Sequence, residues 1–248
     1  MEGNNLNWLT RANFAHRGLY DNKAKIPENS LPAFKRAMDE GYAIALDVQV
    51  ISDQEVIVFH DLTTERLCNK DERVTNLNRG ELIHYKLMKT DNTIPLLTEV
   101  LRFVNGKVPL LIVIKKQSGL KNSNLIILNT LLGYRGDLAI QSFDPFILRW
   151  FAKNAPLIPR GQLYPEIKIE KISRSQKYMQ STFLFNIFSK PHFFSHDIRD
   201  MPNAFVAKKR KNGSIVLGWG VRSTEEYERM SDFCDNIIFE GFKPPKRH

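Results

Sequence analysis

The 248-residue sequence has few cysteines and lacks long apolar runs. Its two cysteines, Cys68 and Cys234, lie far apart and form no CxxC pair. They are most simply free thiols in a reducing compartment, so a cytoplasmic location is expected. No apolar run is long enough to span a bilayer, and no transmembrane segment is expected. The segment Met1–Thr10 is polar and carries Glu2, which argues against a signal peptide.

Internal repeats of solenoid period and low-complexity segments are also missing. The apolar and charged fractions, 42% and 25%, are ordinary for a soluble globular protein. The segment Leu62–Leu97 is too short to form a domain by itself. A single domain over residues 1–248 is therefore expected.

The formal net charge of +9 favours anionic partners, and nucleic acid is the obvious alternative among them. The basic residues are scattered, however, and no RRM, KH or finger motif accompanies them. The KKRK run, Lys208–Lys211, precedes the turn signal Asn212-Gly213. It is predicted to be a basic loop before a strand, and no nucleic-acid partner is expected.

Short apolar runs alternate with helical patterns, which predicts βαβ units and a parallel sheet. One predicted helix runs from Leu31 to Glu40, with Asn29-Ser30 as its cap and Gly41 as its stop. The other predicted helices are Thr98–Val104, Ser123–Leu132, Pro145–Ala155 and Thr224–Cys234. The predicted strands are Asn13–His16, Ala43–Val50, Val56–His60, Pro109–Lys115, Asp137–Gln141, Leu157–Gly161, Pro191–His196, Ser214–Trp219 and Asn236–Phe239.

The short link Ile51–Gln54 interrupts this alternation between the second and third strands. A parallel crossover needs about a dozen residues or more, so these two strands must form an antiparallel hairpin. Eight strands remain, the number of a TIM barrel. The sequence thus predicts an α/β fold, a (β/α)8 TIM barrel with a short hairpin excursion after the second strand. His16, Asp47 and Lys115 then lie toward the C-terminal ends of strands, the active face of such barrels.

The segment Ala15–Asp61 concentrates residues suited to chemistry on a phosphate diester. It reads AHRG, then PENS, then ALDV, then FHD. One histidine can take a proton from a nucleophile while another gives a proton to the leaving oxygen. Arginine binds phosphate oxygens in a fork, and carboxylates hold a hard cation.

These motifs, in this order, resemble the glycerophosphodiester phosphodiesterase family, whose pattern is HRG, PEN, ExD and HD with a later ExK. The resemblance continues in PLLIVIKK (Pro109–Lys116), QSFDP (Gln141–Pro145), LGWGVRS (Leu217–Ser223) and DNIIFEGF (Asp235–Phe242). It implies a hydrolase of phospholipid metabolism that releases an alcohol and glycerol phosphate from a small phosphodiester. It also implies the TIM barrel.

The resemblance implies a role for each motif residue. His16 and His60 are the general acid and base, in an order that the sequence leaves open. Arg17 and Lys115 bind the substrate phosphate, and Trp219 at a strand end is a candidate for the substrate mouth or for the core. The expected cation ligands are Glu28 and Asp47. Asp61 either orients His60 or caps a turn.

Two positions depart from the family pattern. Ala45 replaces the first acid of ExD, and Val113 replaces the acid of ExK; the resemblance places a metal-ligating glutamate at both. A divalent cation, Mg²⁺ or Ca²⁺, is therefore expected to bind weakly if at all. Three explanations remain open: a weak or different cation, a basic group such as Arg17 or Lys115 in place of the metal, or a phosphodiester-binding relative without turnover.

The aromatic stretch Phe183–Phe188, near Lys168, Lys171, Arg174 and Lys177, allows a second interpretation. Aromatic residues beside lysines can mark a helix at a membrane surface. A helix packed on the barrel is the preferred interpretation.

Overall fold

The computed structural model describes residues 6–164 and 185–247, and the chain forms two compact units. The continuous unit is Phe14–Leu138. The two-segment unit combines Met1–Asn13 with Ala139–His248. The single domain expected over residues 1–248 stays a prediction. The basic residues Lys168, Lys171, Arg174 and Lys177 lie outside the described residues, so the membrane-surface interpretation stays open.

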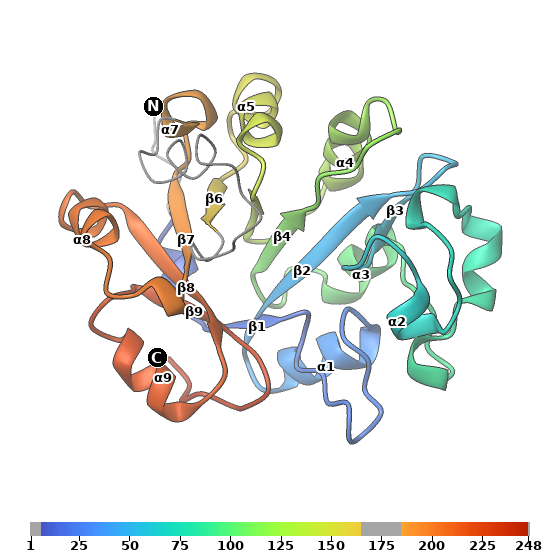
Figure 1. The fold of residues 1–248 in the computed structure, drawn as a ribbon, viewed down its shortest axis with the longest axis horizontal. Helices are drawn as coiled ribbons and strands as arrows, with labels where there is room; N and C mark the ends of the chain where they lie inside the picture. The colour runs from blue at the N-terminus through green and yellow to red at the C-terminus, as the bar shows by residue number, and fades with distance from the viewer. Residues whose placement is uncertain (1–5, 165–184, 248) are drawn as a thin grey trace. The chain divides into compact units, whose positions relative to one another are not determined.

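The continuous unit is organised around its second strand. Its strands are β1 (Phe14–His16), β2 (Ala43–Val50), β3 (Val56–Val58) and β4 (Leu110–Ile114). Both β1 and β4 pair in parallel with β2, whereas β3 pairs with the end of β2 in the antiparallel direction. Figure 1 shows β3 returning beside β2. The predicted hairpin is confirmed.

Helices connect these strands as the alternating pattern predicts. They are α1 (Leu31–Asp39), α2 (Glu65–Cys68), α3 (Leu97–Val104) and α4 (Ser123–Leu131). The predicted cap of α1 is confirmed, because the Ser30 hydroxyl accepts a hydrogen bond from the Ala33 amide at 3.4 Å. Gly41 follows the helix at a φ of +76°, a conformation that favours glycine and ends the helix.

The excursion between β3 and α3 has a small core of its own. It contains α2 and three 3-10 turns, Val74–Asn76, Arg79–His84 and Leu87–Lys89. Leu67 of α2 packs with Val74, Leu77 and Leu87 against Phe59, in a cluster of buried apolar side chains. This packing fixes α2 near the residues that follow β3.

Within its described residues, the two-segment unit contains five strands that pair in parallel with their sequence neighbours. They are β5 (Leu138–Ser142), β6 (Arg160–Tyr164), β7 (Phe193–Asp197), β8 (Ile215–Val221) and β9 (Asn236–Phe239). Its helices are α5 (Pro145–Asn154), α7 (Phe185–Ser189), α8 (Ala204–Lys211) and α9 (Thr224–Met230), and the 3-10 turns are Asn7–Thr10 and Ile198–Asp200. Of the nine strands in the described part of the chain, eight thus pair in parallel within their units, as the α/β prediction requires.

Two local predictions for this unit were wrong. The strand predicted at Leu157–Gly161 begins only at Arg160, because Pro159 has no amide hydrogen for a strand ladder and Leu157 is 80% exposed. The KKRK run is the last turn of α8 rather than a loop. The Asn203 side chain caps this helix by accepting from the Phe205 and Val206 amides, and lysine and arginine are favourable helix formers at a C-terminal turn.

Buried amides join the two segments of this unit. The Asn236 side chain donates to the carbonyls of Leu9 and Ala12, both at 2.7 Å. The Asn13 side chain donates to the Pro245 carbonyl at 2.9 Å. Trp8 and Leu9 are buried. The first residues of the unit are therefore integrated with its last strand.

Helices of the kind that cross membranes were not found: within residues 6–164 and 185–247, none is both long and apolar enough.

Candidate active site

The HRG motif places Arg17 at a sharp turn after β1. His16 ends the strand in register with Ala45, and the Arg17 amide donates to the Ala45 carbonyl at 2.6 Å. Gly18 has a φ of +81°, and a Cβ there would lie 2.8 Å from a backbone atom of Ala33. Only glycine fits this contact and conformation, so the glycine of the motif sets the turn that directs Arg17.

Arg17 joins the two predicted cation ligands. Its Nη1 lies 2.7 Å from Glu28 Oε1, and its Nε lies 3.2 Å from Asp47 Oδ2. The three side chains come from different elements, the β1 turn, the loop before α1 and the middle of β2. The structure therefore brings these three predicted site residues together.

Asn29 makes hydrogen bonds to both Arg17 and Asp47. Its amide donates to the Arg17 carbonyl at 2.9 Å, and its side-chain Nδ2 donates to Asp47 Oδ2 at 3.2 Å. The sequence suggested only a helix cap at Asn29. Asn29 is buried with a φ of +52°, and its two hydrogen bonds link the HRG turn to β2.

Asp47 is buried yet ionised. Burial by itself would raise the pKa of its carboxyl, but the nearby Arg17, His60, His16 and Lys115 more than offset that effect and lower the pKa. Arg17 is in direct contact with this carboxylate, its Nε lying 3.2 Å from Asp47 Oδ2. An acid buried in a strand needs such partners.

His60 is brought beside β2 by the hairpin. The Phe59 amide donates to the Asp47 carbonyl at 3.0 Å, so the antiparallel return places His60 close to Asp47. His60 Nδ1 lies 2.7 Å from Asp61 Oδ1. Burial lowers the pKa of His60, Asp47 and Asp61 oppose this shift, and Arg17 and Lys115 add to it. This contact is the one expected if Asp61 orients His60, and that role stays a prediction.

Arg66 on α2 is a site residue that sequence reasoning missed. Its Nη2 lies 2.7 Å from Glu28 Oε1, its Nη1 3.0 Å from Glu28 Oε2, and its Nε 2.6 Å from Asp61 Oδ2. These contacts, with Arg17, lower the pKa of Glu28 although burial acts to raise it. The only signal in the sequence was a basic residue five positions after the HD motif, inside a segment with no strand pattern.

Lys115 follows β4 and completes the basic group. Burial lowers its pKa, which Asp47 acts to raise and Arg17 to lower. Lys116 is exposed, as strand alternation predicts. Lys115 therefore belongs to the site and Lys116 to the surface.

The arrangement does not fit a divalent cation. Among the residues that the structure describes, no three His, Cys, Asp or Glu side chains are grouped so that they could hold a metal ion. Both oxygens of Glu28 contact guanidinium nitrogens, and Asp47 Oδ2 contacts Asn29 and Arg17. Ala45 and Val113 are buried and offer no ligand atom.

Trp219 belongs to the two-segment unit. Its indole Nε1 donates to the Tyr164 carbonyl at 2.9 Å, and its ring packs edge-on to Phe143. Its assignment as a substrate-binding residue stays a prediction.

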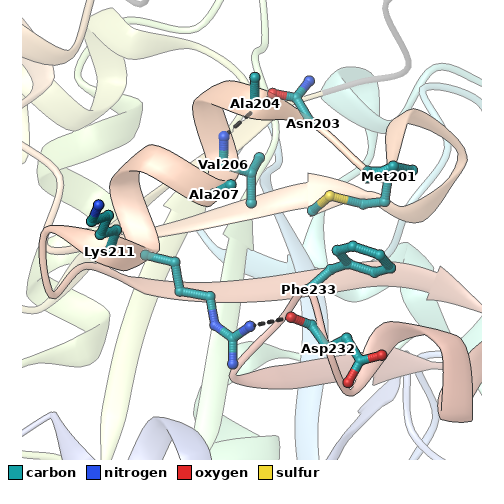
Figure 2. Close-up of a pocket in the computed structure, with 10 residues that line it drawn as sticks. Met201, Asn203, Ala204, Val206, Ala207, Lys211, Asp232 and Phe233 are labelled. Carbon is teal, nitrogen blue, oxygen red and sulfur yellow. Dashed lines mark hydrogen bonds between the residues drawn. The ribbon is translucent and has the colours of Figure 1, made fainter.

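The two-segment unit also contains a cavity of about 640 Å³ (Figure 2). It is lined by Met201, Val206, Lys211, Asp232 and Phe233, among other residues. None of the predicted site residues lines it, and its walls are mainly apolar, so we do not assign the phosphate chemistry to this cavity.

The sequence is similar to proteins of a known family. Residues 16–238 match the glycerophosphoryl diester phosphodiesterase family. The chain belongs to this family. A glycerophosphodiester phosphodiesterase from Caldanaerobacter subterraneus subsp. tengcongensis is 32% identical over 233 residues, which cover 87% of this chain and 88% of the relative.

Solved structures of glycerophosphodiester phosphodiesterases share the fold. The enzyme from Thermotoga maritima is 24% identical with a TM-score of 0.73, over 92% of this chain and 94% of that one. An Oleispira antarctica phosphodiesterase in complex with the product sn-glycerol-3-phosphate is 19% identical with a TM-score of 0.76, over 94% and 93% of the two chains. The predicted (β/α)8 TIM barrel with an additional antiparallel strand is confirmed.

Proposed function

We propose that this chain hydrolyses small glycerophosphodiesters, releasing an alcohol and glycerol phosphate. The observation that carries the proposal is the His60–Asp61 pair beside Asp47, Arg17 and Lys115. Family membership supports the reaction class, and the Oleispira antarctica relative binds the product that this reaction would release.

His60 is suited to take a proton. Asp61 accepts a hydrogen bond from Nδ1–H, which leaves the lone pair of a neutral imidazole on Nε2. Burial lowers the pKa of His60, so this neutral form is favoured near pH 7. We therefore assign proton abstraction to His60 and protonation of the leaving oxygen to His16, an order that the sequence left open.

Arg17 and Lys115 are suited to hold the phosphate. A guanidinium presents N–H donors in a fork that suits phosphate oxygens, and Glu28 and Asp47 hold the Arg17 guanidinium in place. Lys115 adds an ammonium just after β4, which pairs with the other edge of β2 from β1. Together they would counter the charge that builds on the phosphoryl oxygens during attack.

The reaction then has two steps. The glycerol hydroxyl of the substrate attacks phosphorus, a histidine takes its proton, and the leaving alcohol takes a proton from the other histidine. Water opens the resulting cyclic phosphate, with the histidines exchanging their roles. The products are an alcohol and glycerol phosphate.

Hydrolysis of glycerophosphocholine, followed by choline release, tests this proposal. His16→Ala and His60→Ala should each lower kcat/KM by roughly 10²–10⁴-fold, the usual worth of a positioned proton-transfer group. His84→Ala is the matched control, because His84 is exposed on a 3-10 turn of the same unit. Near wild-type rates in either variant of the pair would remove the two-histidine assignment.

The alternative that the sequence left open is a phosphodiester-binding relative without turnover. It would be favoured if the unmodified chain bound glycerol phosphate, measured by calorimetry, and hydrolysed neither glycerophosphocholine nor a chromogenic diester. The cytoplasmic location and the absence of a nucleic-acid partner stay predictions.

A further inference from the structure

Glu28 is held by two arginines rather than left open for a cation. Its side chain is 6% exposed, and Arg66 contacts both of its oxygens while Arg17 contacts one. A buried carboxylate must be neutralised by a partner. In this site the partners are fixed parts of the chain.

Arg66 also reaches a second carboxylate. Its Nε contacts Asp61 while the two Nη nitrogens contact Glu28, so one planar guanidinium bridges two acids. A divalent cation in a hydrolase site has the same effect, since it draws carboxylates together and neutralises them. Through Asp61, the bridge extends to the ring of His60.

The charges of the carboxylates, arginines and lysine of the site balance without a metal, when the two proton-transferring histidines are counted apart. The acids Glu28, Asp47 and Asp61 are matched in number by the bases Arg17, Arg66 and Lys115. A doubly charged cation would leave this set with an excess of two positive charges. Glutamate at positions 45 and 113, where the family resemblance places it, would supply the two negative charges that such a cation requires.

We propose that Arg66 is a positioning residue that supplies the bridging positive charge assigned by the family resemblance to a divalent cation, so that the chain works without one. This inference deepens the proposed function and rests on it. Arg66 acts through Glu28 and Asp61, and the proposal places no substrate contact on it.

Thermal unfolding tests the inference without needing turnover. The unmodified chain should show the same melting temperature in chelator and in millimolar Mg²⁺, Ca²⁺ or Mn²⁺. Arg66→Met should leave the carboxylates of Glu28 and Asp61 without their arginine partner and so able to bind a cation. A cation at about 100 times its Kd should then raise the melting temperature of this variant by roughly 5–10 °C. Arg79→Met is the matched control, because Arg79 is an exposed arginine paired with one acid, Glu55, in the same unit.

Activity supplies the second measurement. Hydrolysis by the unmodified chain should be unaffected by chelator, whereas Arg66→Met should lose roughly 10–100-fold and recover part of this loss on addition of cation. A merely structural role for Arg66 would not produce recovery by a cation. Arg79→Met should match the unmodified chain in both conditions.

The outcomes separate the two proposals. Hydrolysis that chelator abolishes and Mg²⁺ or Ca²⁺ restores in the unmodified chain would overturn the role of Arg66 and leave the phosphodiesterase function standing. Absence of hydrolysis in every condition would overturn the function, and the melting temperatures would still decide whether Arg66 replaces a cation. A folded Arg66→Met variant without any cation response would overturn the inference. If Arg66→Met does not fold, the same melting-temperature comparison is made with Arg66→Lys. A single ammonium lacks the forked donors of a guanidinium, so it cannot bridge Glu28 and Asp61 in the same way.

Discussion

Asp61 lies between two basic side chains and gives one oxygen to each. Oδ1 contacts His60 Nδ1, and Oδ2 contacts Arg66 Nε. The carboxylate is therefore held from one side while it orients the imidazole on the other. Its pKa is lowered, because Arg66 and His60 more than offset the opposing effect of burial.

The titration of His60 should report this contact. Burial holds the pKa of His60 below its ordinary value of 6.5, and the bond from Asp61 raises it in part. Asp61→Asn should therefore lower the pKa further, which NMR titration of the ring protons would show. Because the folded form favours the neutral ring, the stability that His60 contributes is present above pH 6.5 and is lost as the pH falls through the folded-state pKa. An unchanged or raised pKa in Asp61→Asn would contradict the orienting role.

Residues with a motif could be predicted from the sequence, and residues without one could not. His16 and Arg17 stand in one ordered motif at the end of β1 and Asp47 in another within β2, so motif order and strand alternation predict that they share one site. Arg66 reaches the site only because α2 packs through Leu67 on a local apolar core. That placement depends on tertiary contacts which no periodicity in the chain records.

At the level of elements, the pairing of strands β2 and β4 determines which side chains lie beside Asp47. Asp47 pairs in register with Val113, and Ala45 lies two residues before Asp47 on the same face of β2. Both Ala45 and Val113 are buried, as are all residues of β2 and β4, so their site-facing orientation stays a prediction from strand alternation. Neighbouring residues in a parallel register share one side of the sheet, so glutamates at these two positions would lie beside Asp47.

Installing both glutamates should create a cation-dependent protein. Ala45→Glu with Val113→Glu adds two buried acids, which repel one another and lower the melting temperature in chelator. Mg²⁺ or Ca²⁺ should restore it, since a ligand that binds only the folded state stabilises that state. The matched control, Ala45→Gln with Val113→Gln, has the same bulk without charge and should show no response. A folded glutamate variant without cation-dependent stabilisation would show that these positions are not a metal site with two ligands missing.

Elements with a strong period were predicted better than elements set by local caps. The apolar run of β2 and the period of α1 were sufficient to place both. The strand at β6 was displaced because Pro159 interrupts its apolar run. Helix α8 was missed because it begins at a cap on Asn203, although the predicted turn at Asn212-Gly213 does follow it. Caps and ladder hydrogen bonds are single contacts, and hydrophobic patterns do not reveal them.

For the whole molecule, the two-segment unit depends on a few long-range contacts. Asn236→Ala would leave the carbonyls of Leu9 and Ala12 without their donor, and each buried unsatisfied group costs about 1–3 kcal/mol of unfolding free energy. Denaturant unfolding of the variant would measure this loss. Asn154→Ala is the control, because its side chain makes a similar bond to the Trp150 carbonyl at an exposed position and should change stability by no more than about 0.5 kcal/mol. Equal effects of the two substitutions would contradict the importance of the junction.

The division into a continuous unit and a two-segment unit also sets an order of events during synthesis on the ribosome. Every residue assigned to the charged network, from His16 to Lys115, has been made once the continuous unit ends at Leu138. Asn13 must wait for Pro245, and Leu9 for Asn236, before they meet their hydrogen-bond partners. At elongation rates of about 5–20 residues per second, this wait lasts roughly 10–45 s. Throughout this wait the side chains of Trp8 and Leu9, which are buried in the folded chain, stay exposed on the nascent chain, and exposed apolar surface promotes aggregation.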